Sequence, residues 1–153
     1  MPWLMTGTLL IAAYIAQLIF GWRWEWLATL QEYELYKQLT GLALALFFLM
    51  QWRLSVVRMG SASPATRLVS GHRNYGAVVP LFLYLHAITI GYAYIRVMSV
   101  AFLGLVALGL LQQPLARLNR KQVNASWLVT HVALAAVLVF LIGYHAFNAF
   151  YYE

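Results

Sequence analysis

The sequence predicts an all-α integral membrane protein, a helical bundle of about five transmembrane helices that forms a single domain over residues 1–153. Two observations lead to this prediction. Hydrophobic residues make up 63% of the chain and charged residues only 9%, whereas soluble proteins average about 25% charged residues. In addition, about five apolar stretches approach the roughly 20 residues that a helix needs to cross a bilayer. A water-soluble globule is therefore excluded, and membrane lipid is the first partner that we expect.

The apolar stretches follow one another along the chain with short polar connections. They cover residues 3–20, 39–57, 71–94, 97–111 and 127–150. The third and fourth are nearly continuous, and we divide them at Arg96 because about 40 apolar residues is twice the thickness of a membrane. Pro114 is expected to end the fourth stretch. Residues 22–37 are too polar to span, and they predict a helix on the outer surface that either seals the bundle or docks a partner.

Basic residues are concentrated in two of the connections. Arg58, Arg67 and Arg73 lie around the second connection, and Arg117, Arg120 and Lys121 lie between the fourth and fifth stretches. Because cytoplasmic loops carry an excess of Lys and Arg, the N-terminus is predicted inside and the C-terminus outside, as in a bacterial inner membrane. The basic residues form no run that would follow a phosphate backbone, so nucleic acid is not expected as a partner.

The chain contains four histidines in two pairs with the same spacing of 14 residues: His72 with His86, and His131 with His145. On an α-helix, 14 residues make about four turns and about 21 Å, so the members of a pair share a face and lie near opposite leaflets. The third and fifth stretches run in the same direction because one stretch separates them. His72 is therefore expected at the depth of His131, and His86 at the depth of His145.

Two imidazoles that face each other at one depth can bind a haem iron from both sides. The arrangement occurs twice, which predicts an inner haem on His72 and His131 and an outer haem on His86 and His145. Ligation by two imidazoles leaves no open iron position, so electron transfer is favoured over oxygen chemistry. A bare zinc ion fits less well, because two histidines supply half of a tetrahedral shell and the chain has no cysteine.

Other residues near the histidines fit a porphyrin. Gly76 lies one helical turn from His72, where a flat macrocycle would approach the backbone. Arg73 stands at the cytoplasmic edge, where it either pairs with a haem propionate or extends to the membrane surface as an ordinary interfacial arginine. Trp127 is assigned to the belt of interfacial aromatic residues, with no further role.

These residues resemble the ferric reductase-like transmembrane domain family, which includes ferric reductases, NADPH oxidases and the membrane haem subunit of the bacterial methionine sulfoxide reductase system. The resemblance is carried by Gly71-His72-Arg73-x-x-Gly76 followed by His86, and by Trp127-x-x-x-His131 followed by His145. It implies a core of about residues 71–150 that binds two haem b groups in the pairing given above. The chain has no glycine-rich dinucleotide fingerprint, so the nicotinamide-dependent reactions of larger members are not implied.

The predicted function is that of a di-haem cytochrome b subunit that carries electrons across a membrane and has no catalytic residues of its own. The donor is expected to be a membrane quinol or a flavin or haem partner subunit of an oxidoreductase complex, with the acceptor on the other side. The alternatives are a proton or metal-ion transporter that uses the histidines and a structural subunit that anchors an assembly. The apolar stretches contain no Asp or Glu, which disfavours the transporter.

Overall fold

The computed structural model describes residues 2–60 and 66–151, which are helical almost throughout and contain no strand. Six helices follow in order: α1 (Pro2–Phe20), α2 (Glu25–Leu30), α3 (Glu34–Gly60), α4 (Thr66–His86), α5 (Ala93–Arg117) and α6 (Lys121–Tyr151). The predicted all-α helical bundle is therefore confirmed.

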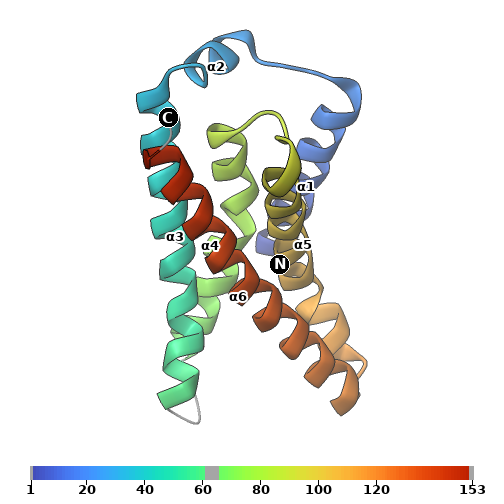
Figure 1. The fold of residues 1–153 in the computed structure, drawn as a ribbon. Coiled ribbons are helices and arrows are strands. Elements are labelled where there is room, and N and C mark those ends of the chain that lie inside the picture. Colours follow the sequence, from blue (N-terminus) through green and yellow to red (C-terminus); the bar gives the residue numbers. More distant parts are fainter. Residues whose placement is uncertain (1, 61–65, 152–153) are drawn as a thin grey trace.

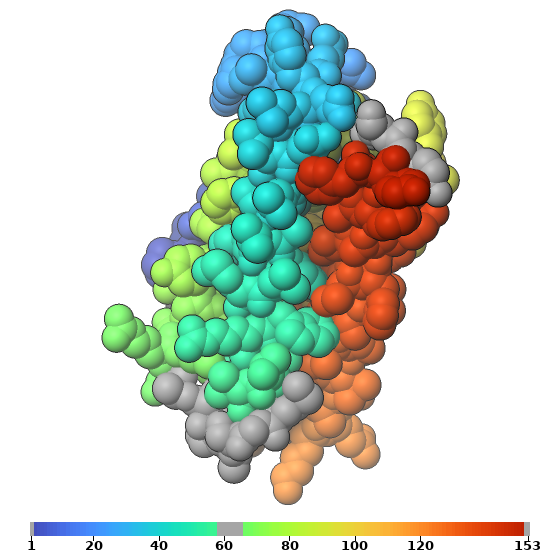
Figure 2. All heavy atoms as spheres, turned by 60° about the vertical axis from the view of Figure 1, so that its left-hand side comes forward, coloured from blue at the N-terminus to red at the C-terminus, as the bar shows by residue number. Residues whose placement is uncertain are grey.

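The five long helices run up and down in one bundle, and α2 lies across one end (Figure 1). Helices α1, α4 and α6 run in one direction, and α3 and α5 run in the other. Helix α4 packs against α1, α3 and α5, whereas α6 packs most closely against α5 and α3. Figure 2 shows α3 and α6 side by side along one face of the molecule. The predicted parallel course of the two histidine-bearing helices, α4 and α6, is present.

Four helices in the described part of the chain are long and apolar enough to cross a membrane: α1, α3 over Glu34–Val57, α5 and α6. Their surfaces expose many large apolar side chains, such as Leu9, Leu46 and Phe140. Because exposed apolar patches of this extent are rare on soluble proteins, these surfaces indicate contact with lipid. Helix α4 falls short of this criterion, since its first half is polar, and it buries Val79, Pro80 and Leu83 inside the bundle.

The predicted division between the third and fourth stretches at Arg96 is wrong. Helix α4 ends at His86, α5 begins at Ala93, and Arg96 lies in the first turn of α5. Side chains from distant segments donate hydrogen bonds to carbonyls at the end of α4 and just beyond it. The phenol of Tyr36 donates to the Leu85 carbonyl at 3.0 Å, and that of Tyr14 donates to the Ala87 carbonyl at 3.0 Å. No local sequence signal marks such an end.

Two other boundaries also differ from the prediction. Pro114 lies inside α5, which continues to Arg117, because a proline near a helix end disturbs few backbone hydrogen bonds. The surface helix expected over residues 22–37 is only the short α2, since a turn after Leu30 separates it from α3. The polar residues from Glu34 onward belong to α3 and extend that helix beyond its apolar part.

Candidate cofactor site

The four histidines meet in two pairs between α4 and α6. The ring centroids of His72 and His131 lie 6.2 Å apart, with the ring planes at 79°. Those of His86 and His145 lie 6.3 Å apart, with the planes at 75°. Each pair joins one histidine of α4 to one of α6, and these are the histidines that the sequence predicts at equal depth. The two contacts thus repeat one geometry at two levels of the bundle.

The spacing of the rings can be compared with that of two imidazoles bound to opposite sides of one metal. A bond of about 2.0 Å from metal to nitrogen, and about 1.15 Å from that nitrogen to the ring centre, places the two centroids about 6.3 Å apart. Both pairs agree with this value. Aromatic rings in simple contact occur anywhere from about 4.5 to 7 Å. Because both pairs have nearly the same centroid distance and nearly the same angle, the repeated geometry supports metal ligation more strongly than either distance alone.

The described residues contain no group of three or more His, Asp or Glu side chains that could hold a metal ion. Each pair supplies two imidazoles, and each imidazole can give one nitrogen ligand. A bare metal ion would need further ligands, whereas haem iron receives four nitrogens from its macrocycle and needs only two axial ligands. The donor set therefore fits a haem better than a bare ion.

The ring of His86 is held by the first turns of α3. Nδ1 of His86 lies 3.1 Å from Oγ1 of Thr40. The next residue, Gly41, allows α3 to approach closely, because a Cβ atom there would lie 2.9 Å from Cε1 of His86. Sequence reasoning missed both residues, since they lie 46 and 45 positions away from the histidine and carry no metal-ligand signature.

The ring of His145 is contacted by the start of α5. The hydroxyl of Tyr94 lies 3.4 Å from Nδ1 of His145, and the Tyr94 ring packs edge-on against Tyr144. This hydrogen bond is at the long end of the usual range, so it constrains the ring less than the contact at His86 does. The two histidines of the outer pair thus each have a hydroxyl at Nδ1, on the side of the ring away from Nε2.

The ring of His131 is stacked on Trp127, one turn earlier in α6. Their centroids lie 5.3 Å apart with the planes at 20°. The indole N–H donates to the Leu108 carbonyl at 2.7 Å, which fixes the indole against α5. Gly109 is the next residue of α5, and a Cβ atom added there would lie 3.6 Å from Cε1 of His131. The assignment of Trp127 to an interfacial belt alone is therefore incomplete, because it also holds a site histidine in place.

Arg73 and Gly76, both expected at the inner haem, lie on α4 near His72. The Arg73 guanidinium lies over the ring of Trp3, 5.4 Å from its centroid. Nε of Arg73 is buried, and no hydrogen-bond acceptor in the described part of the chain reaches it. A Cβ atom added at Gly76 would meet no described atom within 4 Å, and the same holds at Gly143 on α6. Helix α4 therefore offers a buried donor and helices α4 and α6 offer open space, features that a carboxylate-bearing macrocycle could use.

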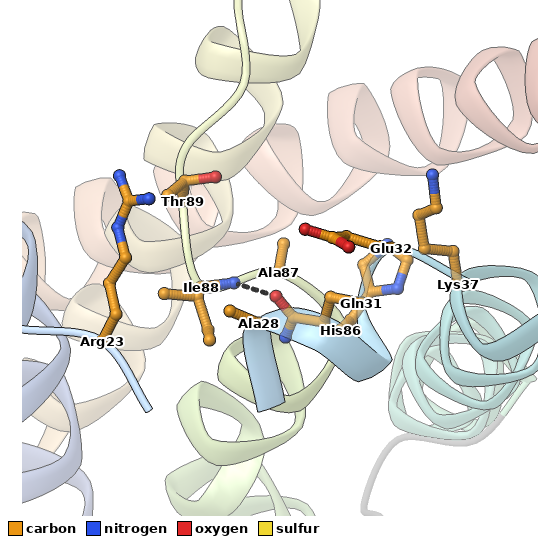
Figure 3. A pocket seen from close by; sticks show the side chains of 9 residues that line it. All are labelled: Arg23, Ala28, Gln31, Glu32, Lys37, His86, Ala87, Ile88 and Thr89. Atoms are coloured by element: carbon orange, nitrogen blue, oxygen red, sulfur yellow. Dashed lines mark hydrogen bonds between the residues drawn. The ribbon is translucent and has the colours of Figure 1, made fainter. Parts of the chain in front are cut away.

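The outer end of the site is closed by the segment around α2. The Gln31 amide donates to the carbonyls of Tyr84 and Leu85, both at 2.9 Å, and its oxygen accepts from the Ile88 N–H at 2.9 Å. His86, the last residue of α4, lines a cavity of about 310 Å³ together with Arg23, Glu32, Lys37 and Thr89 (Figure 3). Of the two roles expected for residues 22–37, sealing the bundle is the one these contacts support. The cavity places His86 close to polar and charged side chains.

Charged residues differ between the two ends of the bundle. At the end where α5 passes into α6, the charged side chains of the described residues are all basic: Arg67, Arg73, Arg117, Arg120 and Lys121. At the α2 end the two signs are mixed: Arg23, Glu25, Glu32, Glu34, Lys37 and Arg96. The asymmetry matches the pattern from which the sequence analysis infers orientation.

Comparison with known proteins adds no name to this geometry. No family model, no curated protein and no solved structure matches the chain.

Proposed function

We propose that this chain is a di-haem cytochrome b subunit that carries electrons between the two faces of a membrane. In this proposal His72 and His131 are the axial ligands of an inner haem, and His86 and His145 are those of an outer haem. The single observation that carries the proposal is the recurrence of one imidazole pair geometry, with separations of 6.2 and 6.3 Å, at two levels of an apolar bundle. The resemblance to the ferric reductase-like family supports the same assignment.

The ligand set favours electron transfer as the chemistry. When bound, each haem would supply an iron that changes between ferric and ferrous states. An iron that is held by an imidazole on each side would have no free position for oxygen or substrate. The protein keeps the two rings of each pair in place through contacts such as Trp127 on His131 and Thr40 on His86. Rings that are fixed in both oxidation states reduce the rearrangement that accompanies electron transfer.

The spacing of the pairs suits a membrane. The 14 residues between His72 and His86 correspond to about 21 Å along a helix, and the hydrocarbon core is about 30 Å thick. A free charge cannot cross this layer without a large solvation penalty. Two stations at these depths divide the crossing into shorter steps, which is the advantage that a pair of haems provides.

Charged residues at the inner end are suited to bind the acidic side chains of haem. Arg73 follows His72 directly, and its buried Nε is available to a carboxylate. The basic end would face the cytoplasm, as in a bacterial inner membrane, and the α2 end would face outward. The donor is a membrane quinol or a partner subunit with flavin or haem, and the acceptor lies across the membrane, so we expect the chain to work within an oxidoreductase complex.

The proposal is tested by purifying the whole chain from membranes of cells that make haem. The expected result is two haem b per chain in a pyridine haemochrome assay, with absorption bands that change on reduction. Replacing His72 or His131 by Ala should remove one haem, and replacing His86 or His145 should remove the other. Asn148→Ala, a matched control one turn from His145 whose amide only donates to the Tyr144 carbonyl, should keep both. A colourless preparation would overturn the proposal.

A further inference from the structure

The hydroxyl of Thr40 joins helix α3 to the ring of His86. Oγ1 lies 2.7 Å from the carbonyl oxygen of Tyr36, 3.2 Å from that of Lys37 and 3.1 Å from Nδ1 of His86. The two carbonyls are acceptors only, so each can interact with the hydroxyl only through its proton. The hydroxyl has a single proton. The shortest of the three contacts indicates that the hydroxyl donates this proton in a hydrogen bond to the Tyr36 carbonyl.

The contact between Thr40 and Nδ1 of His86 therefore uses a lone pair of the Thr40 oxygen. A lone pair can meet Nδ1 of His86 only if that nitrogen carries a hydrogen and donates it. In a neutral imidazole one nitrogen is a donor and the other an acceptor, so a proton on Nδ1 leaves Nε2 with its lone pair. Nε2 is the nitrogen that a metal between His86 and His145 would require.

Three features hold this arrangement in place. Thr40 is in the second turn of α3, where an i to i−4 bond to Tyr36 keeps its hydroxyl in one rotamer. Gly41 lets the His86 ring lie against α3, where an added Cβ would come within 2.9 Å of the ring. The Tyr36 phenol also donates to the Leu85 carbonyl at 3.0 Å. The same turn of α3 thus binds both the backbone before His86 and its side chain.

We propose that Thr40 is a positioning residue for the outer centre, which selects the Nδ1-protonated form of His86 and strengthens its Nε2 as an iron ligand. This inference rests on the proposed haem function. A hydrogen bond from Nδ1–H to an acceptor makes the imidazole a better electron donor, and a stronger donor stabilises ferric iron more than ferrous iron. Thr40 therefore lowers the reduction potential of the outer centre below the value it would have without the hydroxyl.

The test compares Thr40→Val with Thr40→Ser in the whole purified chain. Valine keeps the shape of threonine and removes the hydroxyl, whereas serine keeps the hydroxyl. Thr6→Val is the matched control, because the Thr6 hydroxyl also donates to an i−4 carbonyl, that of Pro2 at 3.0 Å, on the exposed surface of α1. The measurements are haem content per chain, a potentiometric titration of the visible bands, and the low-temperature electron paramagnetic resonance spectrum of the ferric protein.

The expected result is that Thr40→Val binds two haems and raises the potential of one of them. At a fixed ambient potential, the ratio of reduced to oxidised haem at that centre should rise by about tenfold, which corresponds to about 59 mV for one electron. Thr40→Ser should return the ratio close to that of the natural chain, and Thr6→Val should not change it. The shifted component should be the one that is absent from His86→Ala.

Each other outcome is decisive. If Thr40→Val loses the outer haem but Thr40→Ser keeps it, the hydroxyl is needed for ligation and the inference stands. An unchanged titration in Thr40→Val, a shift in the component that survives in His86→Ala, or equal effects of Val and Ser would each overturn it. A natural chain that binds no haem would instead overturn the proposed function, so the two failures can be told apart.

Discussion

Trp127 shows how one residue can serve both the membrane and the site. Its indole stacks on His131 and donates to a carbonyl of α5, so it fixes the ring from one side while α5 supports the indole. An aromatic stack contributes about 0.5–1.5 kcal/mol, and a hydrogen bond of this kind about 1 kcal/mol. These contributions are large enough to change how completely a site is filled.

Trp127→Ala should therefore weaken the inner centre. Loss of the stack and of the hydrogen bond is expected to lower the affinity for the inner haem by about ten- to seventyfold, from about 1.5–2.5 kcal/mol in total. Trp127→Phe keeps a ring beside His131 and should lose less. The measurement is haem per chain after dialysis against a haem-binding apoprotein, with His72→Ala marking the inner component. Equal retention in the Ala and Phe variants would show that the stack does not hold His131.

Tyr94 provides a weaker counterpart of Thr40 on the other outer ligand. Its hydroxyl lies 3.4 Å from Nδ1 of His145, and hydrogen bonds weaken as they lengthen beyond about 3.2 Å. Tyr94→Phe should thus raise the potential of the outer centre in the same direction as Thr40→Val, by less than half as much. Redox titration of the two variants side by side checks this order. A larger shift in Tyr94→Phe than in Thr40→Val would contradict it.

The difference between the histidines and these supporting residues explains what could be predicted. The histidine pairs follow from spacing along single helices and from the parallel course of two helices, both of which are readable in a sequence. Thr40, Tyr94 and Trp127 matter because of how α3 and α5 are rotated toward α4 and α6. Helix rotation is set by packing of the whole bundle, so a single sequence gives no direct signal for such contacts.

At the scale of elements, the turn after α2 and the first turn of α3 cap the end of α4. Helix α4 ends in the interior of the outer end, and its last carbonyls need partners in place of the next helical turn. Gln31 supplies three hydrogen bonds there, and Tyr36 supplies another. This non-local capping explains why the boundary between α4 and α5 could not be read from the residues around Arg96. The polar segment before α3, which looks like a separate surface helix, is part of the support of the site.

Gln31→Leu should destabilise this end of the bundle. It leaves the carbonyls of Tyr84 and Leu85 and the Ile88 N–H without the amide, at a cost of about 1–3 kcal/mol for each buried group that finds no other partner. We expect a lower unfolding temperature in detergent and loss of the outer haem before the inner one. Gln38→Leu is the matched control, because in the described part of the chain the Gln38 amide bonds to the exposed Glu34 carboxylate at 2.9 Å and not to α4. Equal effects of the two variants would show that Gln31 does not cap α4.

At the scale of the whole molecule, composition determined the class of fold. A chain with so few charges has to place its apolar surface against lipid, and helices satisfy their backbone hydrogen bonds without help from neighbouring segments. The exposed Leu, Phe and Val side chains of α1, α3, α5 and α6 are consistent with that environment. Helix α4 departs from the apolar pattern, since it carries His72, Arg73 and Asn74 in one run. Its packing against α1, α3 and α5 keeps His72 and Arg73 partly buried, whereas Asn74 is exposed.

The direction in which the bundle crosses the membrane is the last prediction. The chain has no cysteine, so single cysteines can be introduced and labelled without a background signal. Thr89 lies exposed between α4 and α5 at the α2 end, and Gln122 lies exposed at the opposite end in the first turn of α6. Since basic residues collect at the Gln122 end, that end should stay in the cytoplasm.

A maleimide that cannot cross membranes should therefore label Thr89→Cys in intact spheroplasts and should label Gln122→Cys only after the membrane is opened. Inside-out vesicles should give the reverse pattern, which controls for the intrinsic reactivity of each position. Labelling of Gln122→Cys alone in intact spheroplasts would show the opposite orientation. The cavity beside His86 would then lie on the cytoplasmic side. The pair of His72 and His131 would then lie near the outer face, because the two histidine pairs keep their positions relative to the charged ends.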